Sequence, residues 1–375
     1  MAALDSGTDP ASIVIAAGGT GGHITPGLAL AEALAERAPA ARIAFVGTRR
    51  GMEGELIPAA GYPLHLYDMV QFAGTGWRKA LVPLALVRSA IQARSILRRA
   101  GARVAVTMGG YSGVPLVIGA RLAGVPSIVH EPGAVPGKAN LLAARFTRNL
   151  ATSFPNTRFP RREARLVGYP LGRAITAFDR AALRPEARAA HGLADGDTLI
   201  LVSGGSQGSV RLNDLALDLA ARWAGRTDIR ILLKAGARNH EAVAAALAGH
   251  PAAGIVDLVR YIDSMPHAYA AADLAITRAG AATVSELAVV ELPAVLIPFP
   301  HDEHDEQLHN AEPLVAAGAA LLVRDAEATA DVVGPLIEAR VADGAMLDGM
   351  RTGTRASARP EAADALAAMV LELAR

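Results

Sequence analysis

Short hydrophobic runs alternate along most of the chain with longer segments that have the periodicity of amphipathic helices. Runs that are apolar at every position are typical of parallel strands covered by helices on both faces of a sheet. We therefore predict an α/β protein with two doubly wound, Rossmann-like domains. The predicted strands are 13–16, 43–46, 64–67, 104–107, 127–130 and 150–152 in the first half and 199–202, 229–233, 255–258, 274–277, 294–297 and 320–323 in the second.

The alternation lapses in a charged, proline-bearing stretch at 159–171. We place an N-terminal domain at 11–170 and a C-terminal domain at 171–355. The final segment, 360–375, is predicted to be an alanine-rich helix that packs back onto the first domain. Because ligands of open α/β sheets bind beyond the carboxyl ends of the strands, we expect the active site in a cleft between the two domains.

Composition narrows the function classes. The 375 residues are 51% hydrophobic and 19% charged, which excludes wholesale disorder. Aromatic residues make up only 4% and the net charge is +1, a poor match to readers of nucleic acid. The absence of cysteine excludes disulfides and thiolate chemistry. Neither a signal peptide at the N-terminus nor an apolar run of about 18 residues is found, so we expect a protein that is soluble or lies on a membrane surface.

Three glycine-rich loops follow predicted strands, at 18–23, 109–113 and 204–209, and the first leads into a predicted amphipathic helix from about Pro26 to Glu36. Glycine permits positive φ and removes side chains, so backbone amides can approach charged oxygens or sugar hydroxyls. The first loop lacks the spacing of a dinucleotide fingerprint, and neither the first nor the third is followed by the Lys-Ser/Thr of a P-loop. Such loops can be purely structural turns, but three of them favour a sugar-nucleotide site.

The segment 274–286 carries the most specific signal. A hydrophobic strand leads through a small-residue turn into a helix whose first N–H groups suit a phosphate. Glu286 follows Ala282 and Thr283 by one helical turn, so its carboxylate faces the same side and can accept hydrogen bonds from a ribose diol. The segment therefore predicts a site for a nucleoside diphosphate.

Several titratable residues have two interpretations. His23 is either a helix-start residue satisfied locally or a catalytic base at the end of the first loop. His130 and Glu131, at another strand end, are structural or acceptor-orienting. The acidic and histidine-rich segment 301–306 has the residue types of a divalent-metal site, but a solvated charged loop explains it more simply. We predict neither a metal nor another cofactor.

The glycine loops at 18–23 and 204–209, the MGGYSG segment at 108–113, His130-Glu131, the 278–286 unit and the pair Gln307/Asn310 together resemble the MurG family of glycosyltransferases. The resemblance covers nearly the whole chain in the same order. It implies the two-domain GT-B fold and a peripheral enzyme of peptidoglycan synthesis on the cytoplasmic face of the plasma membrane. The implied reaction moves N-acetylglucosamine from UDP-N-acetylglucosamine to the 4-hydroxyl of lipid I, undecaprenyl-pyrophosphoryl-muramoyl-pentapeptide, with inversion, giving lipid II.

The resemblance also implies roles for individual residues, and we predict that His23 is the general base on the acceptor hydroxyl. The implied substrate-binding residues are Thr20, Gly21 and Gly22 at the donor sugar, Ser206 at the UDP, Ile262 at the uracil, Ala281, Ala282, Thr283, Val284, Ser285 and Glu286 at the diphosphate and ribose, and Gln307 at the sugar hydroxyls. Two positions depart from the family pattern. Gly133 replaces an amide side chain, and Arg173 matches the family's UDP-contacting arginine only with a one-residue shift.

The stretch 72–99 combines apolar residues, among them Trp77, Leu81 and Leu84, with several arginines. Such a pattern is typical of an exposed helix end or of a patch that binds anionic membranes. The polyprenyl acceptor implied by the resemblance favours the membrane. Two other functions compete with the transferase: a UDP-N-acetylglucosamine epimerase, which shares this fold, and a non-catalytic nucleotide-sugar sensor.

Overall fold

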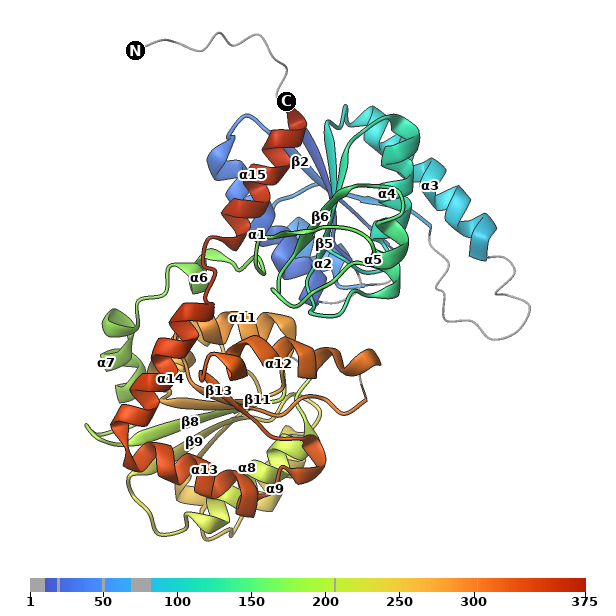
Figure 1. Ribbon diagram of the computed structural model, residues 1–375. Helices are drawn as coiled ribbons and strands as arrows, with labels where there is room; N and C mark the ends of the chain where they lie inside the picture. Colours follow the sequence, from blue (N-terminus) through green and yellow to red (C-terminus); the bar gives the residue numbers. More distant parts are fainter. Residues whose placement is uncertain (1–10, 19–20, 49–50, 69–81, 206, 302) are drawn as a thin grey trace, which may run out of the picture. The chain divides into compact units, whose positions relative to one another are not determined.

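Two separate parallel β-sheets organise the chain (Figure 1). The computed structural model describes residues 11–18, 21–48, 51–68, 82–205, 207–301 and 303–375. One compact unit comprises Met1–Gly172 together with Glu361–Arg375, and the other comprises Arg173–Pro360. Each unit has helices on both faces of its sheet, so the predicted pair of doubly wound α/β domains is confirmed.

The first unit has a seven-stranded sheet in the order β3-β2-β1-β4-β5-β6-β7. Its strands are β1 (Ser12–Ala16), β2 (Arg42–Gly47), β3 (Leu64–Leu66), β4 (Val104–Thr107), β5 (Ser127–Glu131), β6 (Asn149–Thr152) and β7 (Arg165–Leu166). Its helices are α1 (Gly21–Arg37), α2 (Glu53–Ala59), α3 (Val82–Arg99), α4 (Gly113–Ala123), α5 (Lys138–Ala143) and α15 (Ala362–Ala374).

The second unit has a six-stranded sheet in the order β10-β9-β8-β11-β12-β13. Its strands are β8 (Thr198–Ser203), β9 (Ile229–Lys234), β10 (Val256–Val259), β11 (Leu274–Thr277), β12 (Ala294–Leu296) and β13 (Ala320–Leu322). Its helices are α6 (Arg173–Thr176), α7 (Arg180–Ala190), α8 (Val210–Arg222), α9 (His240–Leu247), α10 (Met265–Ala271), α11 (Ala281–Val289), α12 (Glu306–Ala316), α13 (Ala330–Ala342) and α14 (Gly344–Ser357), with short 3-10 turns η2 (Ala253–Ile255), η3 (Glu303–Asp305) and η4 (Asp325–Glu327).

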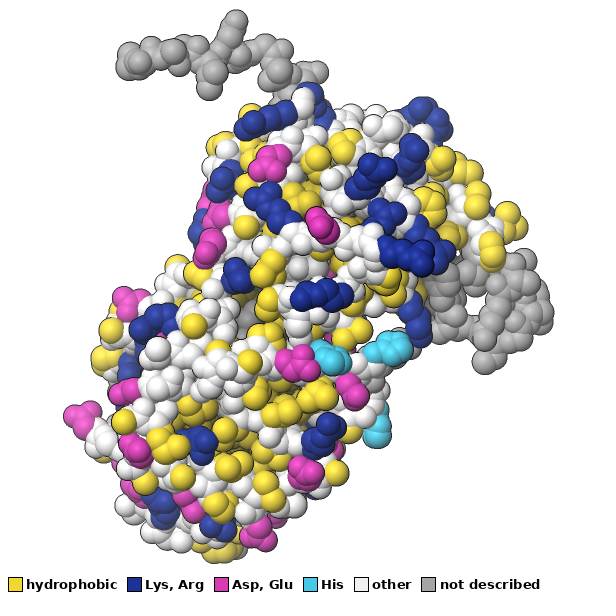
Figure 2. Space-filling view, viewed as in Figure 1, with side chains coloured by type: hydrophobic (Ala, Val, Ile, Leu, Met, Phe, Trp, Pro, Cys, Tyr) yellow, Lys and Arg dark blue, Asp and Glu magenta, His cyan; other side chains and the backbone are white. Residues whose placement is uncertain are grey.

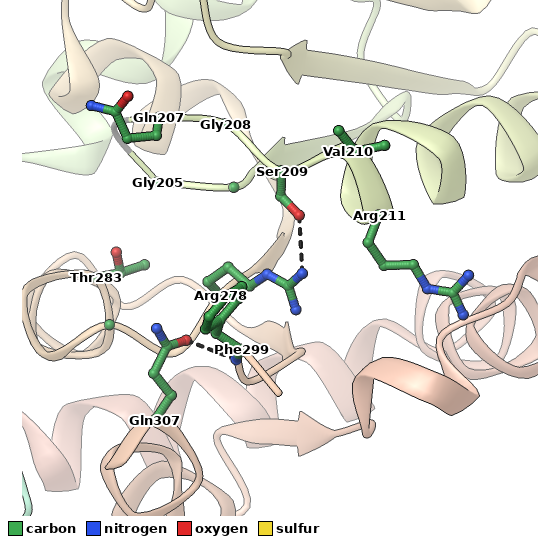
Figure 3. A pocket seen from close by; sticks show the side chains of 12 residues that line it. Gly205, Gln207, Gly208, Ser209, Val210, Arg211, Arg278, Thr283, Phe299 and Gln307 are labelled. Carbon is green, nitrogen blue, oxygen red and sulfur yellow. Dashed lines mark hydrogen bonds between the residues drawn. The ribbon is translucent and has the colours of Figure 1, made fainter. Parts of the chain in front are cut away.

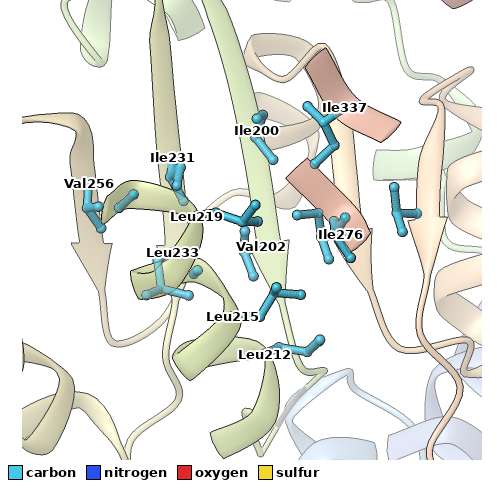
Figure 4. Close-up of a cluster of buried hydrophobic side chains, with 14 of the residues drawn as sticks. Ile200, Val202, Leu212, Leu215, Leu219, Ile231, Leu233, Val256, Ile276 and Ile337 are labelled. Carbon is cyan, nitrogen blue, oxygen red and sulfur yellow. The ribbon is translucent and has the colours of Figure 1, made fainter. Parts of the chain in front are cut away.

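Central strands send alternate side chains to opposite faces of each sheet, as a strand buried on both sides requires. In β1, Ile13 and Ile15 pack with α1 and α15, whereas Val14 and Ala16 join α3 and α4. In the second unit, one face of β8 meets α8 and α13 in a single apolar cluster (Figure 4). The hydrophobic runs in the sequence thus mark strands covered on both faces.

Helix α15 returns from the end of the chain and packs against α1 in the first unit (Figure 1). Leu366 and Val370 are fully buried there, and burying such a side chain contributes roughly 1.5–3 kcal/mol. The ion pairs of Arg37 with Asp364 and of Arg165 with Glu372 are solvent-exposed, and such pairs contribute about 1 kcal/mol or less. Apolar contact, rather than charge, therefore holds this helix in place.

Every strand predicted from the sequence is present, with ends that differ by at most one residue. The prediction missed β7, because its two residues, Arg165–Leu166, form no hydrophobic run. It also expected the first helix to begin near Pro26, whereas α1 begins at Gly21. His23 is therefore part of the first turn of a helix.

The strand order reverses once in each sheet, between β1 and β4 and between β8 and β11. Loops that leave the carboxyl ends of two such strands diverge and open a crevice, which is where ligands of this fold bind. The glycine loops predicted from the sequence follow β1, β4 and β8, and the 278–280 turn follows β11. Both reversal points are therefore lined by the segments that carry the sequence signals.

Candidate functional site

At the first reversal point, His23 lies half-buried in the first turn of α1. Its ring packs against the loop after β4: a Cβ atom on Gly109 would lie 3.0 Å from His23 Cδ2, and one on Gly110 would lie 3.4 Å from Cε1. Both glycines have positive φ, so other residues would be strained there as well as crowded. Burial lowers the pKa of His23 below its ordinary value of 6.5, which favours a neutral imidazole that accepts a proton.

His130 and Glu131 end β5 nearby and serve the structure. His130 is fully buried, and its Nε2 donates to Gly168 O at 3.2 Å. Burial lowers the pKa of His130 to about 4, although the hydrogen bond to Gly168 acts in the opposite direction. The Glu131 carboxylate accepts from Gly133 N and Gly137 N at 3.1 and 3.0 Å and from Asn140 Nδ2 at 2.8 Å. Glu131 thus organises the loop that contains the Gly133 departure from the family pattern.

A pocket of about 530 Å³ occupies the second reversal point (Figure 3). Its walls come from the loop after β8, the β11–α11 turn, the segment after β12 and the start of α12. The glycine loop can follow this path because Gly208 has positive φ, and a Cβ there would lie 2.1 Å from Ala235 O. The described lining residues are Gly204, Gly205, Gln207, Gly208, Ser209, Val210, Arg211, Arg278, Gly280, Thr283, Phe299 and Gln307.

Arg278 ties these walls together. Its guanidinium donates to Asp325 Oδ1 at 2.5 Å. It also donates to Ser209 Oγ at 3.0 Å (Figure 3). It also lies over the Phe299 ring, 5.6 Å from the centroid. Ser209 in turn caps α8 by accepting from Leu212 N. One arginine side chain therefore positions the glycine loop, the aromatic wall and the start of a helix.

The N-terminus of α11 opens at this pocket. Its capping residue, Gly280, offers no side-chain acceptor to the N–H groups of the first turn, and the N-terminus of a helix is the positive end of its dipole. Gln307 Oε1 accepts from Ala279 N at 3.1 Å and from Phe299 N at 3.0 Å, and Asn310 Nδ2 donates to Ala279 O at 3.1 Å. Gln307 and Asn310 thus hydrogen-bond to the N–H and the carbonyl of Ala279, just before α11.

Glu286 lies one turn further along α11, next to Tyr269 and Lys234. The Tyr269 hydroxyl donates to Glu286 Oε2 at 2.6 Å. Burial raises the pKa of Glu286, and the Tyr269 hydrogen bond and the Lys234 charge oppose that rise. The Tyr269 hydroxyl fixes one carboxylate oxygen, and both neighbours favour the ionised form of Glu286.

The remaining predicted residues do not all lie at a reversal point. Gly21 and Gly22 begin α1, Ser285 is half-buried on α11, and Val284 is buried with its N–H bonded to Gly280 O. Ile262 is half-buried in the loop after β10, and Arg173 is exposed at the start of α6, which contacts α11. Thr20 and Ser206 lie outside the described residues.

The sequence analysis missed Lys234, Tyr269, Phe299 and Asp325. Lys234 ends β9 at the carboxyl edge of the sheet, and that position could have drawn attention to it. No local pattern marks the other three, because each reaches its partner from a distant part of the chain. Within the described residues, no group of three or more His, Asp or Glu side chains forms a metal site, and no helix is long and apolar enough to span a bilayer.

Comparison with known proteins identifies the class. Residues 13–152 match the N-terminal domain of glycosyltransferase family 28, and residues 199–366 match the C-terminal domain of the same family. The first match spans β1 to β6 of the seven-stranded sheet, and the second spans the six-stranded sheet. The chain is thus a two-domain glycosyltransferase of the GT-B type, as the strand order and the pocket indicate.

Individual relatives identify the family within this class of glycosyltransferases. A protein of Saccharopolyspora erythraea is 41% identical over 97% of this chain and 94% of its own length, and one of Nocardioides sp. is 42% identical over 96% and 98%. Both are named UDP-N-acetylglucosamine–N-acetylmuramyl-(pentapeptide) pyrophosphoryl-undecaprenol N-acetylglucosamine transferase. The chain belongs to this family of transferases, the MurG family.

Solved structures agree with this assignment. The crystal structure of Acinetobacter baumannii MurG is 27% identical, with a TM-score of 0.80 over 97% of this chain and 100% of that one. A putative UDP-N-acetylglucosamine 2-epimerase of Listeria monocytogenes has a TM-score of 0.66 over 95% of this chain and 94% of that one, but it is only 12% identical. That second likeness shows the shared fold alone, so the comparisons favour the transferase over the epimerase.

Proposed function

We propose that this protein transfers N-acetylglucosamine from UDP-N-acetylglucosamine to lipid I and forms lipid II with inversion at the anomeric carbon. The observation that carries the proposal is the anion pocket at the β8/β11 reversal point of a chain related over its whole length to transferases of that name. The acceptor hydroxyl attacks the anomeric carbon, the bond to UDP breaks, and UDP leaves with the bonding electron pair.

The second unit binds the donor in this proposal. The α11 N–H groups and the glycine loop after β8 hold the diphosphate, because both present backbone donors and α11 adds the positive end of its dipole. Glu286 accepts hydrogen bonds from the ribose hydroxyls, and Ile262 lies at the uracil. Gln307 orients the sugar while its Oε1 holds the backbone.

The first unit binds the acceptor, and His23 takes the proton of the attacking hydroxyl. Its lowered pKa supports this role, because a base must be neutral before it accepts a proton. Gly109 and Gly110 support it as well, since the lack of side chains there leaves room for the imidazole ring. Proton removal by a positioned base is worth about 10²–10⁴ in rate.

The direct test is incubation of the protein with radiolabelled UDP-N-acetylglucosamine and a lipid I analogue, followed by mass spectrometry of the lipid fraction. Transfer adds one N-acetylhexosamine to the lipid and moves the label with it. An epimerase needs no acceptor and leaves the lipid unlabelled, and a sensor binds UDP without consuming the sugar. Absence of labelled lipid with intact UDP binding would contradict the proposal.

We also propose that α3 holds the protein on an anionic membrane surface. Leu84, Val87 and Ile91 share one face of this helix and are 69%, 55% and 55% exposed. Hydrophobic side chains gather over α3 on the surface in Figure 2, and the helix ends with Arg98 and Arg99. An apolar stripe with basic neighbours binds anionic lipid through both area and charge. Trp77 and Leu81, also predicted to take part, lie outside the described residues.

Co-sedimentation with vesicles of anionic and of zwitterionic lipid tests this proposal. Each basic residue near the surface contributes about 1 kcal/mol, so binding to anionic vesicles should weaken as salt rises. Leu84→Glu should reduce binding, whereas Val332→Glu, at a 43% exposed position on α13, should not. If vesicle binding changed neither with salt concentration nor in Leu84→Glu, α3 would be ruled out as the membrane-binding element.

A further inference from the structure

Helix α1 contains a proline where a backbone donor is needed. In an α-helix each carbonyl accepts from the N–H four residues later. The carbonyl of Gly22 therefore has residue 26 as its partner, and residue 26 is proline, inside the helix Gly21–Arg37. Proline has no N–H, and its ring also crowds the carbonyl four residues earlier. The first turn of α1 thus lacks the hydrogen bond that would fix the Gly22 peptide.

A side chain from elsewhere in the first unit supplies this hydrogen bond. The Tyr169 hydroxyl donates to Gly22 O at 2.9 Å. The Tyr169 side chain reaches α1 from the segment that ends the first unit, and the residue is only 3% exposed. The preceding residue is also anchored, because Gly168 O accepts from His130 Nε2. A tyrosine held at both its ring and its backbone aims its hydroxyl in a fixed direction.

We propose that Tyr169 is a positioning residue for His23. Its hydroxyl replaces the missing N–H at position 26 and fixes the Gly22 peptide, which is bonded directly to His23. Gly22 itself is exposed, so water can also bond to its carbonyl, but a free water molecule does not fix the direction of the peptide. The proposal rests on the proposed role of His23 as the base, whereas the structural link from Tyr169 to α1 does not.

A double-mutant cycle between Tyr169→Phe and Pro26→Ala tests whether the Tyr169 hydroxyl takes the place of the N–H that is missing at Pro26. Tyr169→Phe keeps the buried ring and removes the hydroxyl. With Pro26 present, kcat should fall about fivefold, the worth of one ordinary net hydrogen bond, while KM for UDP-N-acetylglucosamine stays the same. In the Pro26→Ala background, the restored N–H can bond to Gly22 O. Tyr169→Phe should therefore lower kcat less than about twofold in that background. Tyr62→Phe, at a half-buried tyrosine that packs on Phe45, is the matched control and should change nothing.

A second measurement does not depend on activity. Amide hydrogen exchange in a peptide that covers 21–30 should be faster in Tyr169→Phe than in the wild type and should return to the wild-type rate in the double variant. The inference would be overturned if Tyr169→Phe lowered kcat equally with and without Pro26→Ala. It would also be overturned if amide exchange in 21–30 were the same in Tyr169→Phe and in the wild type. If the wild type forms no lipid product, the proposed function fails, and the exchange measurement still decides the role of Tyr169.

Discussion

The side chains around the β1/β4 reversal point include His23, and His130 lies close by at the end of β5; burial lowers the pKa values of both histidines. Around the β8/β11 reversal point lies Arg278, whose guanidinium is held by Asp325 and Ser209. The N-termini of α8 and α11 also open there. The strand order is the same in both places, and so is the plan of strand, glycine loop and helix. The first environment favours a neutral imidazole, whereas the second combines a guanidinium with the positive ends of two helix dipoles. The fold thus fixes where a site forms, and the side chains brought to it decide the chemistry.

The largest effect is expected from removing His23, which should lower turnover without changing UDP binding at the other site. We expect His23→Ala to lower kcat at least about a hundredfold and to leave UDP binding unchanged, because the base acts in the transition state and not on the nucleotide. Steady-state kinetics and a UDP titration measure both quantities for His23→Ala and His23→Gln. His65→Gln, at an exposed histidine of the same unit, is the control. A raised KM with most of the turnover retained would instead assign His23 to substrate binding.

The opposite pattern is expected at Glu286. Hydrogen bonds to a charged group contribute about 1.5–3 kcal/mol, so loss of the contacts proposed between Glu286 and the ribose should make Glu286→Ala bind UDP-sugar about tenfold or more weakly. Titration with UDP should show the loss directly. Glu241→Ala, at a glutamate of the same unit whose side chain is 78% exposed, should bind UDP normally. Unchanged competitive inhibition by UDP in the Glu286 variant would remove Glu286 from the donor site.

A moderate effect is expected from pH. Protonated His23 cannot act as a base, so kcat should fall as pH drops through its pKa, and burial places that pKa below 6.5. At pH 6.5 more than half of the plateau value of kcat should therefore remain. The kcat profile between about pH 4.5 and 8.5 measures this, and a half-maximal point above 6.5 would contradict a neutral, buried base.

The smallest effect is expected from removing divalent metal. The second site offers helix N-termini and a glycine loop to the diphosphate, so the leaving group has backbone donors around it. Turnover in EDTA should stay within about twofold of the untreated rate, since no donor contact proposed above passes through a metal ion. Complete loss of activity that magnesium or manganese restores would make segment 301–306 a candidate ligand set again.

The sequence by itself determined the α/β class, the strands and the positions of the glycine loops. These features are local: a run that is apolar at every position can only be buried on both faces, and a glycine cluster after it can only be a turn. The same reasoning singled out His23 and Glu286, because each stands within a few residues of a strand end or a helix start. Gln307 was predicted only from the family resemblance.

Only the tertiary structure decided what those residues touch. Tyr269 reaches Glu286, Asp325 reaches Arg278, and Tyr169 reaches Gly22 across long stretches of chain that leave no periodic signal. The start of α1 was predicted too late, near Pro26, whereas the helix begins at Gly21 and the hydroxyl of the distant Tyr169 donates to the carbonyl of Gly22 in its first turn. Hydrogen bonds between remote residues depend on packing, and packing is a property of the whole fold.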